Sequence, residues 1–176
     1  LGFLVNASIG RRLSKSISGG LASAVMLAAF ALAVVQVMAV AALPEGSREI
    51  SQTVFTWIKS GDFLPDLTFR LDPLSAVMIL IITGIGSLIH IYSTAYMHEE
   101  TDADFARFFS YLNLFVSFML VLVLGSNFLV MFVGWEGVGL CSYLLIGFYY
   151  VKKSAGDAAK KAFITNRIGD AGFLLG

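Results

Sequence analysis

A single carboxylate interrupts the apolar segment 127–150, whose sequence is NFLVMFVGWEGVGLCSYLLIGFYY. Glu136 lies 9 residues from Asn127 and 14 from Tyr150, which is roughly 13 Å and 21 Å along a helix that rises about 1.5 Å per residue. The segment has the length of a membrane-spanning helix, and the carboxylate lies near its middle. Such a residue is costly to insert and therefore indicates function by default.

Three other segments reach the length of roughly 20 apolar residues that a membrane-spanning helix needs. Two shorter apolar runs, one at each end of the chain, look like parts of further helices. The sequence thus predicts an all-α, polytopic transmembrane helix bundle with six segments, two of them partial: 1–9, 20–43, 73–97, 108–125, 127–150 and 158–176.

The composition supports this fold class and excludes others. Hydrophobic residues make up 57% of the chain and charged residues 14%, whereas a soluble domain usually carries about 25% charged residues. The formal net charge is zero, so no basic surface is available for nucleic acid. The only cysteine, Cys141, lies in an apolar run and is expected to pack.

Basic residues predict the orientation, because lysine and arginine are enriched in cytoplasmic connections. The first, third and fifth connections carry eight basic residues and the second and fourth carry three. We expect the chain to start outside, with residues 44–72 as an outer-face loop that holds a short amphipathic piece around Val54, Phe55 and Ile58 and a turn at Ser60-Gly61-Asp62. Residues 1–176 are expected to form one incomplete transmembrane domain.

Glu136 is the main candidate for chemistry. A carboxyl group between a desolvating environment and a movable cation can load and release a proton. The structural alternative is a permanently protonated or ion-paired packing residue. Gly134, Gly137 and Gly139 surround Glu136; small residues allow either close helix packing or the approach of water, and the sequence does not decide between them.

Other polar residues are weaker candidates. Arg167 and Asp170 are three residues apart, so they share one helical face and can form a pair, which either tunes a proton site or is purely structural. His90 is expected to form an interfacial hydrogen bond and not to bind a metal or haem. Asp72-Pro73 is predicted to cap a helix. Several members of the aromatic set Trp57, Trp135, Tyr92, Tyr96, Tyr149 and Tyr150 lie at predicted helix ends, as expected of an interfacial aromatic belt.

Several strings resemble the antiporter-like subunit L of bacterial NADH-quinone oxidoreductase (respiratory complex I), the counterpart of mitochondrial NADH dehydrogenase subunit 5. The resemblance extends from Leu71 to Gly176, and its most specific string includes Gly-Trp-Glu-Gly-Val-Gly-Leu. The strings are DPLS (72–75), LIHIYS (88–93), RFFSYLNLF (107–115), FVGWEGVGLCSYLLIGF (132–148) and NRIGD (166–170).

This resemblance implies a proton-translocating, multi-pass subunit in the bacterial inner (cytoplasmic) membrane, an N-terminal part of a longer chain. It implies that Glu136 transfers protons while paired with a lysine outside this chain, and that Arg167 and Asp170 are modulating charges. No cofactor or metal is expected in the chain itself; FMN, iron-sulfur clusters and quinone are expected in partner subunits. The implied partners are other complex I membrane subunits, protons and lipid.

Two alternatives remain. The large subunit of a multisubunit sodium/proton antiporter would use the same glutamate chemistry, driven by ion gradients. A noncatalytic membrane scaffold would hold Glu136 in a fixed ion pair.

Overall fold

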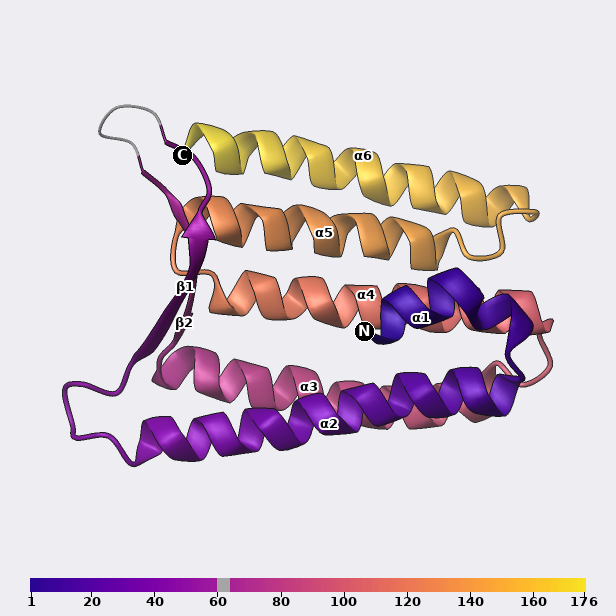
Figure 1. Ribbon diagram of the computed structural model, residues 1–176. Coiled ribbons are helices and arrows are strands. Elements are labelled where there is room, and N and C mark those ends of the chain that lie inside the picture. Colours follow the sequence, from indigo (N-terminus) through magenta and orange to yellow (C-terminus); the bar gives the residue numbers. More distant parts are fainter. Residues whose placement is uncertain (60–63) are drawn as a thin grey trace.

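The computed structural model describes residues 1–59 and 64–176 and shows long helices lying side by side, with one β-hairpin across an end (Figure 1). The predicted all-α membrane bundle is confirmed. The described elements are α1 (Gly2–Ile9), a 3-10 turn (Gly10–Arg12), α2 (Lys15–Ala41), β1 (Ile50–Thr56), β2 (Asp66–Leu71), α3 (Pro73–Tyr96), α4 (Asp102–Leu124), α5 (Phe128–Ile146) and α6 (Lys153–Leu175).

Four of the described helices, α2 to α5, are long and apolar enough to cross a membrane. They coincide with the four full-length segments predicted from the sequence. Helix α6 has 23 residues, enough for about 34 Å of helix, but it carries both Arg167 and Asp170 in addition to the lysines of its first half.

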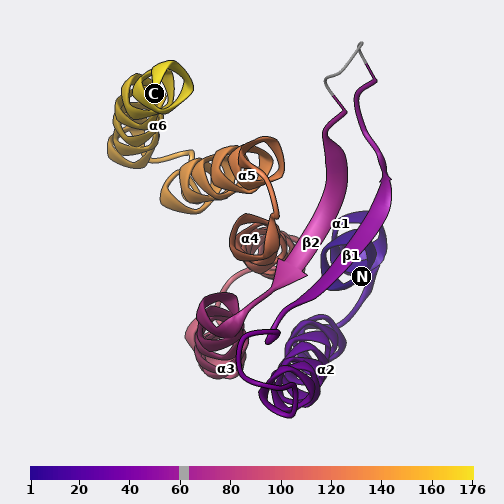
Figure 2. The same ribbon diagram turned by 90° about the vertical axis from the view of Figure 1, so that its left-hand side faces the viewer.

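Helix α4 lies at the centre of the bundle and contacts α1, α2, α3 and α5 (Figure 2). Its buried side chains recur on successive turns at Phe105, Phe109, Asn113 and Val116, as expected for one helical face. Helix α5 packs between α4 and α6. This arrangement places the outer face of α5 against α6, where the candidate site lies.

Side-chain caps fix where the central helices begin. Asp72 Oδ1 accepts from the Ser75 backbone N–H and the Ser75 hydroxyl accepts from the Asp72 backbone N–H, both at 2.8 Å. With Pro73 following, this reciprocal pair confirms the predicted cap. Asn127 caps α5 by accepting from the Val130 N–H at 3.0 Å.

The predicted outer-face loop contains an antiparallel hairpin formed by β1 and β2. Val54 and Phe55 therefore lie in a strand, because β-branched and aromatic residues favour extended pairing. The hairpin is anchored to the α4–α5 turn by the Ser126 N–H, which donates to the Thr68 carbonyl at 3.0 Å. The predicted turn at Ser60-Gly61-Asp62 lies outside the described residues.

Connections alternate between the two ends of the bundle, as the predicted topology requires (Figure 1). The hairpin and the α4–α5 turn lie at one end; the α1–α2, α3–α4 and α5–α6 connections lie at the other. Which end faces the cytoplasm stays a prediction.

Helix α5 ends at Ile146, four residues before the predicted boundary. Gly147 follows as the C-cap, and Phe148 leaves the helix to pack edge-on against Phe108, with 5.5 Å between ring centroids. Phe148 thus belongs to the core at this end and not to the helix, a distinction that hydropathy does not make.

Candidate functional site

Glu136 and Arg167 form an ion pair between the middle of α5 and the second half of α6. An Nη1 N–H of Arg167 donates to Glu136 Oε2. The Glu136 side chain is 23% exposed and that of Arg167 is 48% exposed in this chain. A charge-assisted bond of this kind gives the intramembrane carboxylate the partner that its desolvation demands.

Arg167 also faces a second carboxylate. Its Nη1 lies 3.7 Å from Asp170 Oδ2, three residues further along α6. The predicted Arg167–Asp170 pairing is confirmed by this distance. The guanidinium carbon lies 4.7 Å from the Phe163 ring centroid, and this cation–π contact also stabilises the charge. One arginine therefore lies between two carboxylates from different helices.

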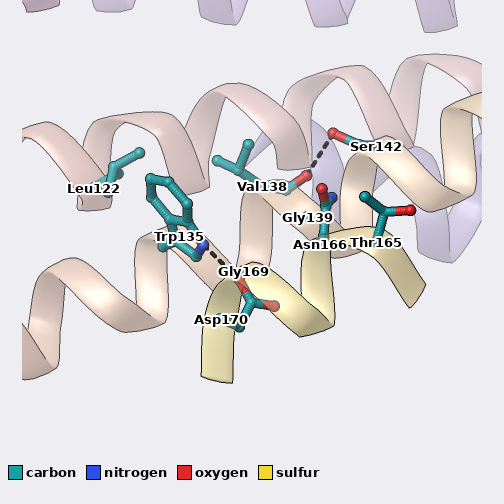
Figure 3. A pocket seen from close by; sticks show the side chains of 9 residues that line it. All are labelled: Leu122, Trp135, Val138, Gly139, Ser142, Thr165, Asn166, Gly169 and Asp170. Atoms are coloured by element: carbon teal, nitrogen blue, oxygen red, sulfur yellow. Dashed lines mark hydrogen bonds between the residues drawn. The ribbon is translucent and has the colours of Figure 1, made fainter. Parts of the chain in front are cut away.

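Asp170 is the most buried member of the cluster, with a side chain 9% exposed. Its Oδ1 accepts a 2.7 Å hydrogen bond from the indole N–H of Trp135, which projects from α5 (Figure 3). The indole is stacked on Phe173 with ring centroids 5.8 Å apart, and Phe173 also stacks on Phe132. Each Asp170 oxygen thus has its own partner, one neutral and one cationic.

A cavity of about 270 Å³ lies between α5 and α6, next to Asp170. The hydroxyl groups of Ser142 and Thr165, the amide of Asn166 and the Asp170 carboxylate make part of its wall polar. The remaining lining residues are Leu122, Trp135, Val138, Gly139 and Gly169 (Figure 3). The volume and polar groups suit a few water molecules.

The three glycines around Glu136 divide between two roles. A Cβ atom at Gly134 would collide with the Leu122 backbone, and one at Gly137 would collide with the Phe118 ring, so both allow α5 to approach α4 closely. A Cβ atom at Gly139 would lie an ordinary 3.8 Å from the Asn166 amide nitrogen. Gly139 lines the cavity. Packing and cavity formation are thus served by different glycines.

His90 is fully buried between α3 and α4, away from this cluster. Its Nδ1 lies 2.7 Å from the Gly86 carbonyl oxygen and its Nε2 lies 3.2 Å from Asn113 Nδ2. Because an amide nitrogen only donates, Nε2 accepts and Nδ1 donates, which describes a neutral histidine that links two helices. The predicted hydrogen bonding is confirmed, but the predicted interfacial position is wrong, because His90 is fully buried between two helices.

The described residues hold no group of three or more His, Cys, Asp or Glu side chains that could bind a metal ion. What the cluster can do is exchange protons. Glu136 and Asp170 can each bind a proton, whereas arginine stays charged. Movement of the guanidinium between the two carboxylates would change which of them is stabilised as an anion.

Two contacts of the cluster do not follow from the sequence patterns. The resemblance implies a lysine partner for Glu136 outside this chain; within the chain, Arg167 is paired with Glu136. Trp135 belongs to the aromatic set from which an interfacial belt is expected, yet it lies in the middle of α5 and donates to Asp170. Its position beside Glu136, distant from either end of the apolar segment, was the available signal, because an indole N–H within an apolar span needs an acceptor.

Two family models match the chain. The model for the NADH-ubiquinone oxidoreductase (complex I) chain 5 N-terminus matches residues 57–109. The model for the transmembrane region of NADH:quinone oxidoreductase and Mrp antiporters matches residues 125–176. The matching sequence strings place the start of the similarity at Leu71. The first family model begins at residue 57, so the similarity extends further toward the N-terminus.

Named relatives agree with these models. NADH-quinone oxidoreductase subunit L of Mycobacterium tuberculosis is 57% identical over 129 residues, which cover 73% of this chain and 20% of the relative. Subunit L of Pseudomonas aeruginosa is 50% identical over 133 residues, covering 76% and 21%. That of Escherichia coli K12 is 51% identical over 125 residues, covering 71% and 20%. The chain spans about a fifth of the length of these relatives.

The fold is also similar to part of the solved Mrp complex from Dietzia sp. DQ12-45-1b. The TM-score is 0.74 at 24% identity, and the match covers 96% of this chain and 17% of that chain. The two family models and the relatives show that the chain belongs to the family of antiporter-like membrane subunits that includes subunit L of NADH-quinone oxidoreductase (complex I chain 5) and the Mrp antiporters.

Proposed function

We propose that this chain is part of a proton-translocating membrane subunit of a bacterial NADH-quinone oxidoreductase. The observation that carries the proposal is the Arg167 guanidinium between Glu136 on α5 and Asp170 on α6. Charges in the middle of membrane-length helices are costly and are retained where ions or protons move. The names of the 47–57% identical relatives support NADH oxidation as the driving reaction.

Glu136 is the proton carrier in this proposal. When Arg167 is close, the ion pair favours the carboxylate, and when Arg167 shifts toward Asp170, the desolvated carboxylate takes up a proton. Asp170 and Arg167 thereby modulate the proton affinity of Glu136. A lysine on a later helix of the complete subunit, outside this chain, would complete the glutamate-lysine charge pair that the family resemblance implies.

The cellular setting follows from the same comparison. The four apolar helices make the chain a multi-pass membrane protein, and we place it in the bacterial inner membrane with other membrane subunits of the complex. FMN, iron-sulfur clusters and quinone would be bound by partner subunits, so that this chain would contribute proton movement and no electron transfer.

The test is NADH-driven proton uptake into inverted membrane vesicles that carry Glu136→Gln in the full-length subunit, with assembly checked on a native gel. We expect a lower ratio of protons pumped to NADH oxidised. Glu45→Gln is the matched control, because the Glu45 side chain is 92% exposed. An unchanged ratio in the assembled Glu136→Gln complex would reduce Glu136 to a structural residue.

The second candidate is a sodium/proton antiporter subunit, since the second family model and the solved structure include Mrp proteins. The same vesicles distinguish the two. Proton movement that requires a sodium gradient and ignores NADH would favour the antiporter.

A further inference from the structure

We propose that Trp135 is a positioning residue that holds Asp170 in place so that only the Arg167 side chain moves during proton transfer. This inference rests on the proposed function of Glu136, Arg167 and Asp170. Neither the proposed proton chemistry nor the family comparison assigns a role to the indole.

The hydrogen bond between Trp135 and Asp170 joins α5 to α6 at the charged cluster. Its length of 2.7 Å is typical of a bond to a charged acceptor. The indole has one donor and does not titrate, so its bond to Asp170 does not depend on the protonation of Glu136. Trp135 therefore fixes one Asp170 oxygen while the other remains free to meet Arg167 at 3.7 Å.

The aromatic stack holds the donor in its direction. The Trp135 and Phe173 ring planes are 17° apart, and those of Phe132 and Phe173 are 16° apart. A stack of three rings from two helices restricts rotation of the indole about its side-chain bonds. The N–H is thus aimed at Asp170 before any charge moves.

The orientation of Asp170 matters because a cavity with polar groups lies beside it. Trp135 and Asp170 lie together in its wall, with Ser142, Thr165 and Asn166 further along (Figure 3). An Asp170 released from the indole would be free to turn toward these polar groups and away from Arg167. Loss of the indole N–H therefore changes how Arg167 is divided between Glu136 and Asp170, even though no charge has been removed.

The test uses Trp135→Phe in the full-length subunit of the assembled complex, compared with Asp170→Asn and with the double variant. Protons pumped per NADH oxidised are measured in inverted vesicles. We expect Trp135→Phe to cause at least about half of the Asp170→Asn loss, and we expect the double variant to be no worse than Asp170→Asn alone, because interacting residues are not additive. Trp57→Phe, in the residues just after β1, is the matched control.

Replacement of Trp135 by 3-benzothienylalanine keeps the bicyclic shape and removes only the N–H. If Trp135→Phe impairs assembly, this replacement takes its place as the test of the proposal. We expect it to lower the pumping ratio as much as is expected of Trp135→Phe. Normal pumping with this residue would overturn the proposal, as would additive losses in the double variant. These outcomes differ from a failure of the proposed function itself, because in that case Glu136→Gln would also pump normally.

Discussion

Arg167 has two carboxylate partners, so its geometry matters as much as its charge. The planar guanidinium presents five N–H donors in a fork, whereas a lysine is a compact point charge. We expect Arg167→Gln to reduce the pumping ratio about as much as Glu136→Gln, and Arg167→Lys to retain part of it. Proton uptake by inverted vesicles measures both variants. Full pumping by Arg167→Gln would show that the cation is structural.

The Asp72 carboxyl group predicts that stability depends on pH at the N-terminal end of α3. The backbone N–H of Ser75, followed by the Ser75 hydroxyl, lowers the pKa of Asp72 below its ordinary value of 3.8. A lowered pKa means that the carboxylate stabilises the folded state above about pH 4, and that this stability is lost as the pH falls through the lowered pKa.

The check is thermal unfolding of the purified full-length subunit in detergent at several pH values. Asp72→Ala should cost about 1 kcal/mol near neutral pH through loss of the cap. Asp72→Asn keeps a capping side chain but cannot titrate, so it should remove most of the acid sensitivity of this site at little cost near neutral pH. An unchanged acid sensitivity in Asp72→Asn would contradict the assignment.

Glu136, Arg167 and Asp170 were predictable as candidates because charges in apolar segments are rare and costly. Their mutual contacts were only partly predictable. The Arg167–Asp170 pair follows from a spacing of three residues on one helix. The Glu136–Arg167 and Trp135–Asp170 contacts join residues 31 and 35 positions apart, so they depend on how α5 rotates against α6.

At the scale of helices, Gly134 determines how closely α5 approaches α4. A Cβ atom there would meet the backbone of Leu122, which cannot move aside as a flexible side chain could. We expect Gly134→Ala to destabilise the folded subunit by about 1–3 kcal/mol through overpacking. Thermal unfolding in detergent measures this change. Gly139→Ala is the matched control, and equal stability of the two variants would contradict the packing role.

Helices were predictable because apolar length alone identifies membrane spans, and the Asp72-Pro73 signal correctly located the start of α3. The hairpin was not predicted, because its strands pair across a polar segment of mixed charge and do not show clear alternation. The end of α5 was also misplaced. Phe148 is apolar because it packs in the core against Phe108, a contact between residues distant in sequence.

For the whole molecule, the arrangement of connections predicts which residues are accessible from each side of the membrane. Ser51 lies in the exposed strand β1 and Ser154 in the first turn of α6, at opposite ends of the bundle (Figure 1). With the buried Cys141 replaced by alanine, a membrane-impermeant maleimide should label Ser51→Cys in intact spheroplasts. It should label Ser154→Cys only after permeabilisation. The reverse pattern would invert the predicted orientation.

The central claim is that Glu136 carries a proton, and the most direct measurement compares Glu136→Asp with Glu136→Gln in assembled complexes. Aspartate keeps a titratable carboxyl group, whereas glutamine keeps the shape and hydrogen-bonding capacity without it. Protons pumped per NADH oxidised should remain substantial in Glu136→Asp and fall in Glu136→Gln. Equal pumping by Glu136→Gln and the unaltered complex would contradict the claim.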